Sequence, residues 1–158
     1  MALRNIITEG DDILRKKARE VDQISDRILT TLDDMYETMK AYDGIGIAAP
    51  QIGVLRRMFI IEVDEEHIEL INPEIVEAEG TQKGDEGCLS VPGFIGTVER
   101  PAYIKMRGKN RKNEEVEVEG SGLLAVALCH EYDHLEGTLF RDKATEISEL
   151  IEETEDKK

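Results

Sequence analysis

Apolar residues recur every three or four positions in one early stretch of the chain, which is the spacing of one face of an α-helix. The stretch has five such residues, spaced four, four, three and four positions apart: Ile24, Ile28, Leu32, Met35 and Met39. A later stretch, residues 123–129, is apolar at nearly every position, so we expect a second helix that is buried on most sides. Ser121 is expected to cap this second helix and Gly137 to end it.

Runs of β-branched and aromatic residues between these helices predict short strands. The runs are residues 57–63, 68–71, 103–106 and the alternating residues 115–119. Turn signals separate them, Asn-Pro at residues 72–73 and Gly-Lys-Asn at residues 108–110.

The end of the chain, residues 145–156, has the pattern of an acidic amphipathic helix. Thr145 is the expected cap, and Ile147, Leu150 and Ile151 form its apolar stripe. The pattern as a whole predicts an α+β fold, with short mixed antiparallel strands around a central helix, an N-terminal helix and a C-terminal helix.

Composition and charge limit the function classes. With 158 residues, 40% of them hydrophobic, and no internal repeat or linker, the chain is expected to form a single domain, residues 1–158. A net charge of −15 argues against direct nucleic-acid binding, because phosphate contacts need clustered Lys and Arg. Two cysteines, without a signal peptide or a membrane-length apolar run, predict a cytoplasmic protein that does not enter a membrane.

The sequence His130-Glu131-Tyr132-Asp133-His134 follows directly on the apolar run of the central helix. Positions four apart lie on one helix face, so both imidazoles can reach one divalent ion while Glu131 flanks it as a base. The central helix would then be a metal-binding helix. A catalytic site of this kind needs a third protein ligand and an open position for water.

Three residues are candidates for the third ligand. His67 lies in a charged stretch that resembles a turn before a strand, where solvent exposure explains it. Cys129 is rotated by about 100° from His130 and should face the packed side of the helix. Cys88 lies in a glycine-rich loop, residues 83–93, that can bring a thiolate close to a helix. A small buried side chain is the alternative interpretation of Cys88.

The segment Gly44-Ile45-Gly46-Ile47-Ala48-Ala49 superficially fits the dinucleotide-binding fingerprint. That fingerprint must follow a strand and begin a helix, whereas here a helical pattern precedes it and Pro50 follows. We therefore do not expect a dinucleotide cofactor.

Three separated blocks together resemble the peptide deformylase family, in its order and approximate spacing: residues 44–51, 86–90 and 130–137. The resemblance extends over the flanks and covers nearly the full length of the chain. Cys129 departs from the family, which usually has Gln before the first metal-binding His, and this affects a local hydrogen bond but not the ligand set.

The resemblance implies a hydrolase that removes the N-formyl group from the formylmethionine of newly made proteins and releases formate. Cys88, His130 and His134 would hold one divalent ion. Water bound to the metal would attack the formyl carbon, with Glu131 as general base and then acid. The side chain of Gln51 and the backbone N–H of Leu89 would stabilise the oxyanion.

Further residues are expected around the metal ligands and in the substrate pocket. A ligating His normally donates its other ring N–H to an acceptor, for which Asp133 and Glu86 are candidates. Arg100 is expected to pair with Glu86, and a solvated Arg100 is the alternative. The family lines its methionine pocket at positions matched by Ile45, Gly46, Leu123, Val126 and Ala127.

Fe²⁺ is the ion expected from the family, and Zn²⁺, Ni²⁺ or Co²⁺ would also suit one Cys and two His ligands. The expected partners are formylmethionyl nascent peptides, with a transient encounter with ribosomes. Two other functions share part of the pattern. A zinc endopeptidase also uses a His-Glu-x-x-His helix but commonly takes a third His or Glu, and a structural metal-binding protein would need four protein ligands.

Overall fold

The computed structural model describes residues 2–149, which form two antiparallel sheets and three α-helices. In chain order the elements are α1 (Asp26–Ala41), β1 (Gly46–Ala48), β2 (Met58–Val63), β3 (Glu66–Glu79), β4 (Gln82–Cys88), β5 (Val91–Arg100), β6 (Tyr103–Lys109), β7 (Glu115–Ser121), α2 (Gly122–Leu135), α3 (Phe140–Lys143) and β8 (Ala144–Glu149). Short 3-10 helices span Asp12–Arg15 and Ala49–Ile52.

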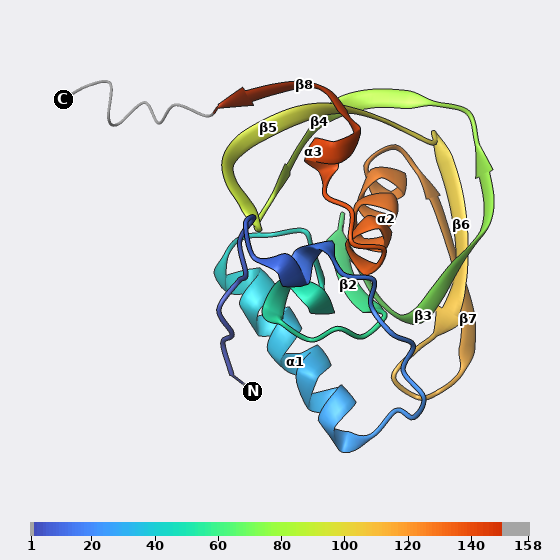
Figure 1. The fold of residues 1–158 in the computed structure, drawn as a ribbon. Helices are drawn as coiled ribbons and strands as arrows, with labels where there is room; N and C mark the ends of the chain where they lie inside the picture. Colours follow the sequence, from blue (N-terminus) through green and yellow to red (C-terminus); the bar gives the residue numbers. More distant parts are fainter. Residues whose placement is uncertain (1, 150–158) are drawn as a thin grey trace.

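The five-stranded sheet has the order β1-β2-β3-β6-β7, and the three-stranded sheet has the order β4-β5-β8. In Figure 1, helix α2 lies in the middle of the fold, with β3, β6 and β7 to its right, β4 and β5 above it and α1 below it. The predicted α+β class, with antiparallel strands around a central helix, is confirmed.

Strand β2 is buried on both faces and connects two hydrophobic cores. Phe59, Ile61 and Val63 belong to the core that includes α2. Met58 and Ile60 belong to the core that includes α1. Because successive side chains of a strand point to opposite faces, this one strand packs against both helices.

Helix α1 forms where its periodic apolar residues predict it. The Ser25 side chain accepts a hydrogen bond from the backbone N–H of Ile28 (3.4 Å) and so caps the helix. The apolar face, which includes Leu32, Met35 and Met39, is buried against β1 and β2.

Helix α2 also begins and ends where the sequence predicts. Ser121 occupies the N-cap position, although its side chain makes no capping hydrogen bond. The helix ends at Leu135, and Gly137 follows with a φ of +77°. A Cβ at Gly137 would lie 2.5 Å from the Arg15 carbonyl oxygen, so both its conformation and its surroundings require glycine.

The glycine-rich segment around Cys88 is not the loop that the sequence suggests. It forms a hairpin of β4 and β5 in which Cys88 pairs with Val91, and Leu89 and Ser90 form the turn. Pairing continues from there back to Gln82 and Arg100. A thiol at the end of a paired strand is held more rigidly than one in a loop.

The predicted turn at Asn72 is a bulge within β3, between Ile71 and Glu74. Asn72 has a φ of +53°, and its side-chain amide replaces the missing strand contacts. Its oxygen accepts from the Val21 backbone N–H (2.8 Å), and its nitrogen donates to the Val21 carbonyl (2.9 Å).

The predicted C-terminal helix is wrong for the residues that the structure describes. Thr145 and Ile147 lie in strand β8, which pairs with β5 along its length and lies at the top of Figure 1. Leu150 and Ile151 lie outside the described residues. A helix here would lose the backbone hydrogen bonds between β8 and β5. These hydrogen bonds outweigh the local helical pattern.

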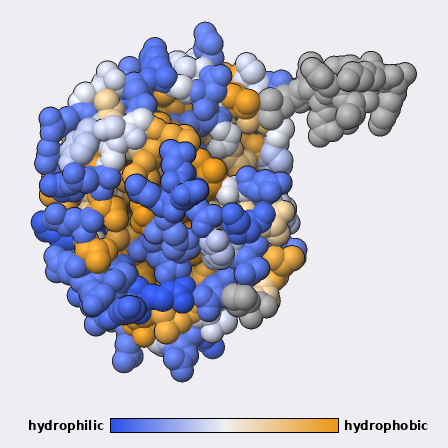
Figure 2. All heavy atoms as spheres, turned by 180° about the vertical axis from the view of Figure 1, so that it is seen from behind, coloured by the Kyte–Doolittle hydropathy of each residue, from blue (hydrophilic) through white to orange (hydrophobic). Residues whose placement is uncertain are grey.

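One face of the surface is mainly polar. Figure 2 shows the face opposite to that of Figure 1, where hydrophilic side chains predominate and hydrophobic ones are exposed in patches between them. No helix within residues 2–149 combines the length and the apolar character needed to cross a bilayer.

Candidate metal centre

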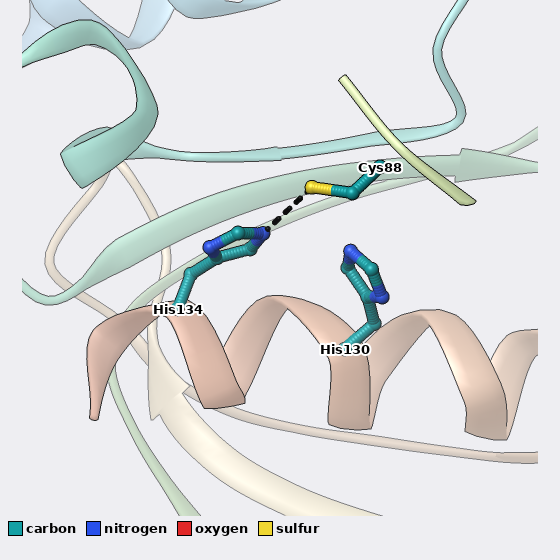
Figure 3. A group of neighbouring side chains, drawn as sticks. All are labelled: Cys88, His130 and His134. Atoms are coloured by element: carbon teal, nitrogen blue, oxygen red, sulfur yellow. Dashed lines mark hydrogen bonds between the residues drawn. The ribbon is translucent and has the colours of Figure 1, made fainter. Parts of the chain in front are cut away.

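Helix α2 and the β4–β5 hairpin bring a thiol and two imidazoles together. Figure 3 shows that His130 and His134 point from the same side of α2 towards Cys88. The Cys88 Sγ lies 3.3 Å from the His134 Nε2, and one donor atom from each of the three side chains lies within 4.8 Å of the others. The pair spaced by four positions and the distant cysteine therefore meet, as the sequence predicts.

The three donors fit a divalent metal ion. In a tetrahedral site with ordinary metal–sulfur and metal–nitrogen bonds, sulfur and nitrogen ligands lie about 3.5 Å apart, close to the 3.3 Å found here. Glu131 supplies a second indication, because its buried Oε1 has no hydrogen-bond partner within the described residues. Three protein donors leave a coordination position open beside this carboxyl, as a catalytic site requires.

Glu131 is buried beside the two imidazoles, and burial raises the pKa of its carboxyl to about 7. Strand β1 passes unusually close to it. A Cβ at Gly46 would lie 2.6 Å from the Glu131 Oε2, so the approach of backbone and carboxyl requires glycine at this position. A carboxyl with a pKa near neutrality can take up and release a proton.

Gln51 is fixed between β1 and the hairpin. Its side-chain oxygen accepts from the Ala48 backbone N–H (2.9 Å). Its Nε2 donates to the Ser90 hydroxyl (3.1 Å) and lies 3.6 Å from the Cys88 Sγ. The fixed oxygen orients the amide so that its N–H groups face the metal ligands. The sequence did not identify Ser90, and no local signal distinguishes it from other turn serines.

A chain of buried charges supports His130 from behind. The His130 Nδ1 lies 2.9 Å from a Glu86 carboxylate oxygen, and Arg100 donates to both oxygens of Glu86 at 2.8 Å. Burial alone would raise the pKa of Glu86, but the hydrogen bonds from Arg100 and His130 lower it to about 2. Glu86 is therefore ionised and holds the His130 ring with its other nitrogen free for a metal. The alternative of a solvated Arg100 is wrong, because this side chain is buried.

Asp133 lies in the same network but does not contact an imidazole. It accepts from Arg100 (2.6 Å) and from Lys143 (3.0 Å). Through Arg100 it is linked to Glu86, which contacts His130. The sequence did not identify Lys143, which lies ten positions beyond Asp133 in α3.

The other His and Cys lie away from the cluster, as expected. Cys129 is buried in the core around α2, and burial raises the pKa of its thiol to about 11. Neither Cys88 nor Cys129 forms a disulfide. His67 is exposed and lies within β3 rather than in a turn, between the carboxylates of Glu62 (3.3 Å) and Glu69 (3.5 Å).

A cavity of about 410 Å³ opens beside the metal ligands. All of the residues that the sequence assigned to a substrate pocket line it: Ile45, Gly46, Leu123, Val126 and Ala127. Cys88, His130 and Glu131 form part of the same wall, together with Gln51 and Leu89. A substrate in this cavity would therefore contact apolar side chains and the catalytic candidates at once.

Comparison with known proteins gives a consistent result. A model of the polypeptide deformylase family matches residues 3–149. The peptide deformylase of Alkaliphilus metalliredigens is 58% identical over 143 residues, which is 90% of this chain and 97% of that protein. The peptide deformylase of Acetivibrio thermocellus is 56% identical over 155 residues, 98% of this chain and 89% of that protein. The crystal structure of peptide deformylase from Thermotoga maritima, 39% identical, superposes with a TM-score of 0.89 over 92% of this chain and 100% of that one.

Proposed function

Because the chain belongs to the polypeptide deformylase family, it is a metal-dependent hydrolase that removes the N-formyl group from nascent peptides, and we propose that Cys88, His130 and His134 hold its metal. The observation that carries this proposal is the convergence of these three donors beside the buried carboxyl of Glu131. The open position faces a cavity large enough for a peptide terminus.

The metal, when bound, supplies a Lewis acid that polarises the formyl carbonyl and lowers the pKa of water towards about 7. We propose Fe²⁺ as the native ion. Zn²⁺, Ni²⁺ and Co²⁺ suit the same one sulfur and two nitrogen donors.

Glu131 moves the proton in this mechanism. Its carboxyl accepts a proton from the attacking water and then returns it to the leaving amine. In the protein without its metal, burial raises the pKa of this carboxyl to about 7, within the range where general acid–base groups work best. The close passage of Gly46 keeps the carboxyl in place during the transfer.

Gln51 and Leu89 stabilise the charge that develops on the formyl oxygen. Ala48 and Ser90 hold the Gln51 amide in place, and the N–H that is directed at the Cys88 Sγ (3.6 Å) would turn to the formyl oxygen. The backbone N–H of Leu89, in the turn that follows Cys88, is the second donor. Removing one donor of this kind typically costs about 3 kcal/mol of transition-state stabilisation.

The methionine side chain packs against the apolar wall formed by Leu123, Val126 and Ala127 from α2, by Gly46 from β1 and by Ile45 directly before β1. These α2 positions lie on the same face as His130, at the spacings i, i+3, i+4 and i+7. One helix face therefore presents both the pocket and a metal ligand. This arrangement fixes the distance between the side chain that is recognised and the bond that is cleaved.

We also propose the setting in which the enzyme works. A single catalytic domain accounts for residues 1–158, acts in the cytoplasm and meets nascent peptides in transient encounters with ribosomes. The excess of acidic residues opposes direct binding to ribosomal RNA, which supports recognition of the peptide itself.

The test compares formate release from formyl-Met-Ala-Ser with cleavage of casein, using protein purified anaerobically with ferrous iron. We expect formate release that stops after treatment with a chelator, and no cleavage of casein. Metal-dependent cleavage of casein without formate release would instead indicate an endopeptidase. A metal needed for folding but for neither activity would indicate a structural site.

A further inference from the structure

Phe94 lies at the rim of the substrate cavity and is held from outside by an arginine. It belongs to β5 and lines the cavity, while its neighbours Pro92 and Gly93 are exposed. The guanidinium carbon of Arg141 lies 4.8 Å from the centroid of the Phe94 ring. This distance is typical of a cation–π contact.

Arg141 is itself fixed by a second charged residue. Its Nη1 donates to a carboxylate oxygen of Glu9 at 2.6 Å. The backbone N–H of Glu9 donates to the Ser90 carbonyl (2.7 Å), which ties this segment to the hairpin that carries Cys88. Segments far apart in the sequence thus meet around one aromatic ring, and β8 adds backbone pairing between Phe94 and Glu149.

The cavity is larger than a methionine side chain needs. Its volume of about 410 Å³ lies in the range of pockets that enclose drug-sized ligands. From His130 to Leu123 the lined face of α2 spans seven residues, which is about 10 Å along the helix axis. There is room for the residue that follows the methionine.

The rim of the cavity exposes apolar side chains. Leu123 is 53% exposed and Ile45 is 46% exposed, and both line the cavity with Phe94. Large apolar side chains gathered around a cavity mouth are typical of a surface that a ligand covers. The rim therefore favours an apolar group on the ligand.

We propose that Phe94, held by Arg141 and Glu9, is a specificity-determining residue that favours a large apolar side chain, aromatic above all, immediately after the formylmethionine. The proposal rests on the proposed function. Because the ring is already fixed, it loses little conformational freedom when a substrate side chain packs on it. Arg141 and Glu9 are positioning residues that act through Phe94.

The experiment measures kcat and KM for formyl-Met-Phe-Ser and formyl-Met-Gly-Ser. The wild-type enzyme should prefer the Phe peptide in kcat/KM, through a lower KM. Phe94→Ala should reduce the ratio of the two kcat/KM values about tenfold, the effect of removing apolar contacts from a pocket. Arg141→Ala should reduce the ratio about threefold. Arg141→Lys should reduce the ratio less than Arg141→Ala does, because an ammonium also makes cation–π contacts.

Arg107→Ala is the matched control, because Arg107 pairs with Glu117 on β6 and β7 (3.1 Å) and does not line the cavity. It should leave the ratio unchanged. The inference is overturned if the wild-type enzyme does not distinguish the two peptides, or if Phe94→Ala keeps the full preference. It is also overturned if Phe94→Ala lowers kcat equally for both peptides, the sign of a purely structural role. Failure of the wild-type enzyme on both peptides with metal bound would refute the proposed function as well.

Discussion

Replacing Glu131 with glutamine is expected to lower kcat for formyl-Met-Ala-Ser by about 10³-fold while one metal ion per chain remains bound. The amide has the shape of the carboxyl, so the close passage of Gly46 is preserved, but it cannot accept the proton of the attacking water. The ligands Cys88, His130 and His134 are untouched. The measurement combines steady-state formate release with the metal content of the same sample.

Stability provides the control for this variant. An ionised carboxyl with an unpartnered buried oxygen costs free energy, and a neutral amide costs less, so Glu131→Gln should unfold at or above the wild-type temperature. Glu117→Gln, on the exposed face of β7, should keep full activity. Near-normal turnover in Glu131→Gln with the metal retained would refute the assignment of Glu131 as the base.

Replacing Arg100 with methionine is expected to lower the free energy of unfolding by about 3–5 kcal/mol. Arg100 is buried and compensates two buried carboxylates, Glu86 and Asp133. Without it, both charges lose their principal partner in a region that water does not reach. Since Glu86 also orients His130, the variant should bind its metal about tenfold more weakly. Denaturant titration and the rate of metal loss to a chelator measure the two effects.

The matched control is Arg107→Met, whose exposed ion pair with Glu117 should contribute less than about 1 kcal/mol. Removing one of the orphaned charges as well, in a Glu86→Gln, Arg100→Met double variant, should recover part of the lost stability. An unfolding free energy for Arg100→Met within the range of the Arg107 control would contradict a compensating role.

The helices and the central strands could be predicted from the sequence because their apolar patterns agree with their packing. Helix α1 buries the face that its periodicity marks, and β2 is apolar at every position except Glu62 because it is covered on both sides. The end of α2 was predictable because Gly137 needs a positive φ that few other residues adopt.

The three-stranded sheet could not be predicted in the same way. Strand β4 reads Gln-Lys-Gly-Asp-Glu-Gly-Cys and has no apolar alternation, so it is held mainly by pairing with β5. Strand β8 contains Ile147, the first residue of the apolar stripe that suggested a helix, yet it pairs with β5 across Gly96, where a Cβ would lie 2.8 Å from Phe140. Such pairing depends on residues about 50 positions away, which local patterns do not contain.

The candidate site was predictable where chemistry restricts the residue types. Two imidazoles four positions apart indicate a metal site by themselves, whereas the choice of Cys88 also needed the resemblance of its block to the family, and the structure brings the three together. The residues that support the metal ligands were harder to predict from the sequence. Asp133 contacts Arg100 rather than an imidazole, and the contributions of Ser90 and Lys143 emerge only from the fold.

Formate release during titration of the metal-free protein with ferrous iron, under anaerobic conditions, tests the central claim most directly. The account predicts that the rate on formyl-Met-Ala-Ser rises from near zero and reaches its plateau at one ion per chain, and that Cys88→Ala shows no such rise. Full formate release by the metal-free protein, or an undiminished rise in Cys88→Ala, would contradict the claim that Cys88, His130 and His134 hold the metal on which the reaction depends.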